Sequence, residues 1–174
     1  MSSWKFVFDQ LENAELLAKS GAGKPRQAAL RRAVSTSYYA LFHALCELAA
    51  RNLVGWRTPW DGFTPIFRSV EHRRTRWILD KGGSRAPHPL GQEIERIGIA
   101  FRQLQDAREW ADYNPEPHFD RQRVETGPNF SRAEAVRLIE IARDAVERLN
   151  ALDESTQKRL AALLVARSRK ETNR

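Results

Sequence analysis

RRAVSTSYYALFHALCELAARNL, residues 31–53, is the stretch of sequence that decides the fold. Wound as an α-helix, it has apolar residues on nearly every side, and a helix of that kind lies buried inside a protein. We therefore predict a central helix over residues 25–53. Ser35, Tyr39 and His43 interrupt its apolar surface at every fourth position, so they lie along one line of the helix. Because buried polar groups need partners, this line predicts a polar contact with a neighbouring helix.

Four further segments repeat their apolar residues with helical spacing, at residues 5–20, 63–79, 90–113 and from 131 onward. The last segment opens with Ser131 and Glu134, the pattern of a capping box. It either continues past Asp153 or breaks there, and the pattern leaves both possibilities open. We predict an all-α fold, an antiparallel bundle of about five helices over residues 1–150, followed by a helical extension and basic tail over 151–174.

The segment 63–79 has two different faces. Its apolar face is predicted to point inward and consists of Phe63, Ile66, Phe67, Val70, Trp77 and Ile78. The other face would form a basic surface made of Arg73, Arg74 and Arg76. Trp56 and Trp60 stand in the loop before this segment, where exposed tryptophans would suit the docking of a protein partner.

Composition narrows the class of protein. The chain has 174 residues and a net charge of +7, which suits RNA or another polyanion, although a codon bias toward arginine would give the same balance. The single Cys46 excludes an internal disulfide and is predicted to be a small buried hydrophobe. No apolar run is long enough to cross a membrane and the first residues lack a secretory signal, so we expect a cytoplasmic protein.

Arg108 occupies a position that the apolar period of segment 90–113 assigns to the core. Because a guanidinium keeps its charge, it needs an anion or several acceptors there. Asp112 follows four residues later and lies within reach on the same helix. The pair is either a structural ion pair at the helix end or a phosphate-binding arginine that Asp112 orients, and the sequence leaves both interpretations open.

Proton-transfer chemistry is predicted only around His43. If Arg108 and Tyr113 lie opposite it, an imidazole, a guanidinium and a phenol together could bind phosphate and transfer protons. The spacing of the histidines, with no carboxylates nearby, does not suit a metal site, and we expect neither a metal nor a cofactor. The remaining histidines are scattered over helices and loops: His72, His88 and His118.

Two motifs resemble those of the HEPN family, the higher-eukaryote and prokaryote nucleotide-binding domains. The first is Tyr38-Tyr39-Ala40-Leu41-Phe42-His43, and the second is Arg108 followed by Ala111-Asp112-Tyr113. Both fall on predicted helices and stand in the order found in the family. The resemblance covers about residues 5–150.

The resemblance implies a helical bundle that forms a homodimer and acts in bacterial defence or toxin–antitoxin systems. It implies binding of RNA or a nucleotide, and an antitoxin or a nucleotidyltransferase as a partner protein. The site that it implies is a polar cluster of Tyr39, His43, Arg108, Asp112 and Tyr113.

Many members of this family are metal-independent RNases whose motif is an arginine, four to six residues and a histidine. Here Tyr113 follows Arg108 after four residues, and Asn114 and Pro115 come next, so the histidine is missing. We therefore expect an RNA- or nucleotide-binding protein with a degenerate RNase motif. Two alternatives are an endoribonuclease toxin, in which Arg108 works with His43 or Tyr113, and a structural module that binds a partner.

Overall fold

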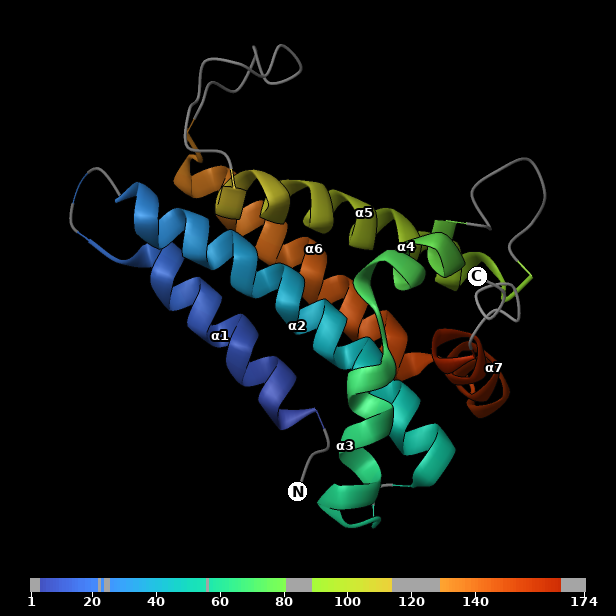
Figure 1. Cartoon of the computed structure of the whole chain (residues 1–174). Coiled ribbons are helices and arrows are strands. Elements are labelled where there is room, and N and C mark those ends of the chain that lie inside the picture. The colour runs from blue at the N-terminus through green and yellow to red at the C-terminus, as the bar shows by residue number, and fades with distance from the viewer. Residues whose placement is uncertain are drawn as a thin grey trace, which may run out of the picture.

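The computed structural model describes residues 4–21, 23, 26–55, 57–80, 89–113 and 129–166, and every regular element in these ranges is an α-helix. The helices are α1 (Lys5–Lys19), α2 (Gln27–Val54), α3 (Trp60–Ser69), α4 (His72–Asp80), α5 (Gln92–Tyr113), α6 (Arg132–Ala151) and α7 (Glu154–Val165) (Figure 1). The predicted all-α bundle is confirmed, and these ranges contain seven helices where the sequence suggested about five.

α2 is the central helix of the bundle. It lies between α1 and α5, with α6 behind it, and it also contacts α3 and α7 (Figure 1). Tyr38, Leu41 and Leu45 are at most 1% exposed, and Cys46 is buried as predicted. Because burying each large apolar side chain contributes about 1.5–3 kcal/mol, packing on several sides is what holds this helix in place.

One stripe of α2 stays open. Arg32 is exposed, and Thr36, Tyr39 and His43 are half-buried, whereas every other residue between positions 30 and 46 except Arg31 is buried. These four positions recur every three or four residues and therefore share one face of the helix. We call them the open stripe. Its side chains meet both flanking helices, since His43 contacts Gln10 on α1 and Tyr39 contacts Arg108 on α5.

The prediction of one helix over residues 63–79 was wrong, because Val70 is extended, with φ −75° and ψ 123°, and ends α3. α4 then begins at His72 with a new direction, so the apolar pattern of the whole segment no longer describes one face. Trp77, predicted to be inward, is 54% exposed, while Ile78 and Leu79 are buried.

The fifth predicted helix breaks near Asp153, one of the two possibilities that the sequence left open. Its beginning is as predicted, since Ser131 and Glu134 form the capping box of α6. Leu152 is extended, and the Asp153 side chain then accepts a hydrogen bond from the backbone N–H of Thr156 and caps α7. α7 places Leu160, Ala161 and Leu164 in the same core as the helices before it.

Two contacts fix neighbouring elements. The Gln27 side chain donates to the carbonyl of Phe130 and accepts from its N–H, at 2.8 and 3.0 Å, which ties the start of α2 to the start of α6. On α5, Gly98 lies so close to α4 that an added Cβ would be 2.8 Å from the carbonyl oxygen of Leu79. No helix among the described residues has both the length and the apolar character needed to span a membrane.

Candidate functional site

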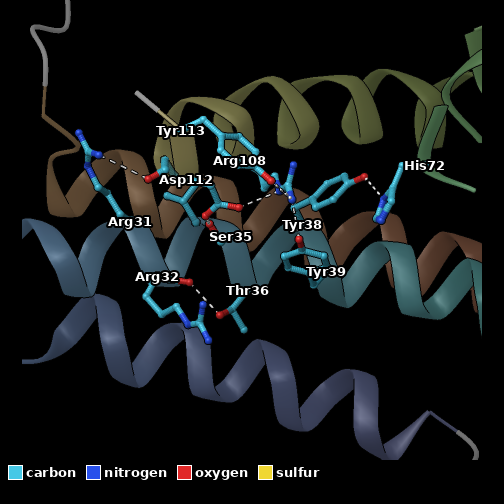
Figure 2. A network of polar contacts seen from close by, with 12 residues as sticks. Arg31, Arg32, Ser35, Thr36, Tyr38, Tyr39, His72, Arg108, Asp112 and Tyr113 are labelled. Carbon is cyan, nitrogen blue, oxygen red and sulfur yellow. Dashed lines mark hydrogen bonds and ion pairs between the residues drawn. The ribbon is translucent and has the colours of Figure 1, made fainter. Parts of the chain in front are cut away.

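Arg108, near the end of α5, reaches across to α2 (Figure 2). Its Nη2 donates to the hydroxyl of Tyr39 at 2.7 Å and to the hydroxyl of Tyr113 at 3.3 Å. Its Nε lies 2.8 Å from Oδ2 of Asp112, and its side chain is 18% exposed. α2 and α5 are therefore adjacent, and Arg108 meets the polar line of the central helix at Tyr39.

Asp112 links the two helices a second time. The Ser35 hydroxyl on α2 donates a hydrogen bond to its Oδ1, while Oδ2 faces Nε of Arg108. Nε is enclosed and its N–H is not aligned for a hydrogen bond, so the contact with Asp112 is an ion pair and not a hydrogen bond. The Arg31 side chain also donates to the carbonyl of Ala111, at 3.5 Å.

One nitrogen of Arg108 is left over. Nη1 makes no hydrogen bond within the described ranges and is not among the fully enclosed polar atoms there, so it is at least partly accessible to solvent. The sequence left open whether Arg108 is a structural ion pair or a ligand-binding group. The geometry supplies the ion pair and also leaves two N–H donors of Nη1 available.

Three phenol rings surround the guanidinium. Its Cζ lies 5.9 Å from the ring centre of Tyr38, 5.4 Å from that of Tyr39 and 5.0 Å from that of Tyr113. Burial alone would lower the pKa of Arg108, but the hydrogen bond with Tyr39 and the charge of Asp112 outweigh it, and the net pKa is raised. The group therefore carries a permanent positive charge in a largely aromatic setting.

His43 belongs to a different part of the open stripe and does not touch Arg108. Its Nδ1 lies 3.0 Å from the side-chain oxygen of Gln10 on α1, and its ring lies near those of Phe6 and Phe67. Its contact with the predicted cluster is the ring of Tyr39, 6.0 Å away centre to centre. Burial lowers the pKa of His43. The cluster therefore gathers Tyr39, Arg108, Asp112 and Tyr113, with His43 at its edge.

His72 is the residue that the sequence did not assign to the site. It is the first residue of α4, and its Nδ1 lies 2.6 Å from the hydroxyl of Tyr38 (Figure 2). Its ring stacks on Phe42, with centres 3.7 Å apart and planes 22° apart. Tyr38 could have indicated that such a partner exists, because a fully buried phenol on the central helix needs a hydrogen-bond acceptor from another element.

The three arginines of the predicted basic surface differ in their partners. Arg73 is exposed, but Arg74 donates from two nitrogens to the carbonyl of Leu163, at 3.2 Å each, and thereby ties α4 to α7. Arg76 pairs with Asp106 at 2.8 Å and with Asp80 at 3.5 Å, so its charge is largely balanced. The three arginines therefore do not act as one patch.

A shallow depression beside the cluster has the opposite charge. It is lined by Asp106, Glu109, Trp110 and Tyr113, all on α5. Asp106 already pairs with Arg76, and the Glu109 carboxylate disfavours an anionic ligand there. Figure 2 shows Arg31 directed toward the end of α5 and Arg32 directed toward α1, on the other side of α2.

The chain matches no protein-family model, no curated protein and no solved structure. Within the described ranges, no three His, Cys, Asp or Glu side chains gather as metal ligands would. His88, His118 and Trp56 lie outside the described residues, as does the tail after Ala166, while Trp60 begins α3 and is 78% exposed.

Proposed function

We propose that this chain is a HEPN-like protein that binds RNA or a nucleotide through a phosphate held by Arg108. The observation that carries the proposal is the position of Arg108, whose Nη1 is at least partly accessible to solvent while its other nitrogens face Tyr39, Tyr113 and Asp112. Arg32, exposed on the open stripe, adds positive charge to α2.

A guanidinium held in this way suits a phosphate for three reasons. It is charged at every physiological pH, and its orientation is fixed before the ligand arrives, so less side-chain entropy is lost on binding. Its half-buried setting lowers the local dielectric and strengthens each charge-assisted hydrogen bond. One carboxylate oxygen of Asp112 faces Nε of Arg108, and the other accepts a hydrogen bond from Ser35. Neither oxygen is engaged with Nη1, which stays available to an anion.

The same geometry favours binding over cleavage. Cleavage of RNA needs proton transfer from the ribose hydroxyl and to the leaving oxygen. Where the RNase motif of the HEPN family has its histidine, this chain has Tyr113. A phenol is a poorer proton shuttle than an imidazole at neutral pH, and the Tyr113 hydroxyl already accepts from Arg108. A place in a bacterial defence or toxin–antitoxin system, with an antitoxin or nucleotidyltransferase as partner, is the context that the motif resemblance suggests.

The test is RNA binding at low salt, followed by fluorescence anisotropy of a labelled oligoribonucleotide. Arg108→Ala should weaken binding on the order of tenfold to a hundredfold, because charge-assisted hydrogen bonds contribute about 1.5–3 kcal/mol. The matched control is Arg137→Ala, an exposed arginine on α6 behind α2, which should change binding little. Binding by the wild type should fall steeply as salt rises. Equal binding by wild type and Arg108→Ala would refute the proposal.

The endoribonuclease alternative is separated by a cleavage assay with a metal chelator present. The wild type should cleave weakly or not at all, and Tyr113→His, which restores the motif, should gain chelator-resistant cleavage. Robust cleavage by the wild type that Arg108→Ala abolishes would favour the nuclease. The absence of any RNA or nucleotide binding at low salt would favour the partner-binding module, in which the cluster only joins α2 to α5.

A further inference from the structure

His72 is exposed, yet its ring is held firmly on two sides. One face stacks on Phe42, which is 7% exposed, and Nδ1 is hydrogen-bonded to the buried hydroxyl of Tyr38. Two such contacts fix both the position and the rotation of the imidazole ring. The hydrogen bond satisfies the buried hydroxyl of Tyr38, and together with the stacking it presents the remaining nitrogen of the ring, Nε2, in a fixed direction at the surface.

The hydrogen bond with Tyr38 decides which nitrogen carries the proton. Burial raises the pKa of Tyr38 far above its usual value, so the phenol keeps its proton. Within the described ranges the hydroxyl of Tyr38 has no other acceptor than Nδ1 of His72, and a buried O–H without an acceptor costs about 1–3 kcal/mol. The phenol therefore donates, Nδ1 accepts, and the neutral ring carries its proton on Nε2.

The ring also stays neutral near pH 7. The side of the ring that packs against its neighbours is desolvated, which lowers the pKa of His72, and the positive charge of Arg108 and the neighbouring His43 lower it further. The titratable groups that face it are Tyr38, Tyr39 and His43 from α2 and Arg108 from α5. His72 is thus an N–H donor at its surface edge and has no lone pair there to act as a general base.

Arg108 and His72 lie on either side of the same two phenols. Tyr38 is 5.9 Å from the Arg108 guanidinium carbon and 5.7 Å from the His72 ring, and for Tyr39 these distances are 5.4 and 6.2 Å. Figure 2 shows the ring of Tyr38 between the two residues. A ligand that met both donors would therefore have to span this phenol ring.

We infer that His72 is a second ligand-contacting residue, whose Nε2–H donates to an oxygen of the nucleotide next to the phosphate that Arg108 holds. This inference rests on the proposed function and narrows its ligand to a strand of two or more nucleotides. A free mononucleotide would reach Arg108 alone. Because Nε2 donates, the contact recognises an acceptor such as a phosphate, ribose or base carbonyl oxygen.

The binding test uses uridine monophosphate and a short oligouridylate with wild type, Arg108→Ala and His72→Phe. The phenyl ring keeps the stacking on Phe42 and removes both nitrogens. His72→Phe should weaken oligouridylate binding by about tenfold, as one lost hydrogen bond of roughly 1.4 kcal/mol predicts, and leave uridine monophosphate binding unchanged. Arg108→Ala should weaken both.

The other outcomes distinguish a failure of the inference on His72 from a failure of the proposed function. If Arg108→Ala weakens both ligands and His72→Phe weakens neither, the inference on His72 fails and the proposed function stands. Equal weakening of both ligands by His72→Phe would refute the assignment to a second nucleotide. If neither variant affects either ligand, the proposed function itself fails.

A second measurement is independent of binding and of how well His72→Phe folds. The ¹⁵N chemical shifts of the wild-type imidazole should show a protonated Nε2 and an unprotonated Nδ1 at His72, and adding oligouridylate should shift the Nε2–H signal. Tyr38→Phe removes the donor and should let the other tautomer appear. A wild-type ring protonated on Nδ1, or an Nε2–H signal unmoved by saturating oligouridylate, would overturn the inference.

Discussion

At the scale of single residues, Asp112 is the residue on which the position of Arg108 depends. Asp112→Ala leaves a half-buried guanidinium without its anion and the Ser35 hydroxyl without its acceptor. We expect the free energy of unfolding to fall by about 1–3 kcal/mol, measured by chemical denaturation. Arg108→Ala should cost a similar amount, since it leaves the carboxylate unpaired.

The chain offers a matched control for this prediction. Asp144 and Arg148 on α6 are also an aspartate and an arginine four residues apart, 2.6 Å from each other, but the Asp144 side chain is 61% exposed. Asp144→Ala should change stability by only about 0.5 kcal/mol or less, as is typical of surface pairs. Similar small effects for Asp112→Ala and Asp144→Ala would show that the Arg108 pair is effectively solvated.

Single residues also show what the sequence could and could not predict about the site. Arg108 was found because an arginine in an apolar stripe demands partners, and Tyr39 because helical spacing puts it on the polar line. His72 was missed because nothing local marks it. Its role depends on Tyr38, which is 34 positions away in sequence, and on the direction that α4 takes after Val70.

At the scale of helices, the crossing of α4 and α5 depends on Gly98. Alanine is the better helix former by about 1 kcal/mol, but its Cβ would lie 2.8 Å from the backbone oxygen of Leu79. A backbone atom cannot turn aside as a side chain can, so we expect Gly98→Ala to lower the free energy of unfolding by about 1–3 kcal/mol. Denaturant unfolding would measure this, and a more stable variant would show that the two helices separate freely.

Helix ends differ in how visible they are in sequence. The start of α6 was predicted because Ser131 and Glu134 form a capping-box pattern that lies within four residues of sequence. The break between α3 and α4 was not, because Val70 is compatible with a continuing helix and becomes extended only in its three-dimensional setting. That break moved Trp77 from a predicted inward position to the surface.

At the scale of the whole molecule, stability should depend on pH through two histidines. The pKa values of His43 and His72 are both lowered, mainly by burial. The unfolded chain therefore takes up protons near pH 6.5, whereas the folded chain does so only at lower pH. The contribution of these histidines is fully present above about pH 6.5 and is lost as pH falls through the folded pKa values.

Thermal unfolding midpoints from about pH 7.5 down to about pH 5 would measure this effect. The double variant His43→Gln/His72→Gln should give a flatter curve. Glu47 acts in the opposite direction, because burial raises its pKa and its charged form is disfavoured in the folded state. A slope in the double variant as steep as in the wild type would assign the pH dependence to other groups.

We also predict that the chain forms a homodimer. Several large apolar side chains remain exposed, among them Phe6 at 57%, Trp60 at 78% and Tyr113 at 69%, and an interface between two copies would cover residues of this kind. The motif resemblance points the same way. Sedimentation at micromolar concentration should show a species of twice 20.0 kDa. A single species at the monomer mass would contradict this prediction.

The central position of α2 has a consequence for how the chain folds. α2 packs against α1, α3, α5, α6 and α7, and its pairings with α1 and α3 are the closest in sequence, so these three helices can meet before the more distant α6 and α7 arrive. A truncation inside α2, such as Leu41→Ala, should therefore slow refolding, whereas Leu160→Ala on α7 should mainly accelerate unfolding. The helix that carries the open stripe would then also be the nucleus around which the molecule assembles.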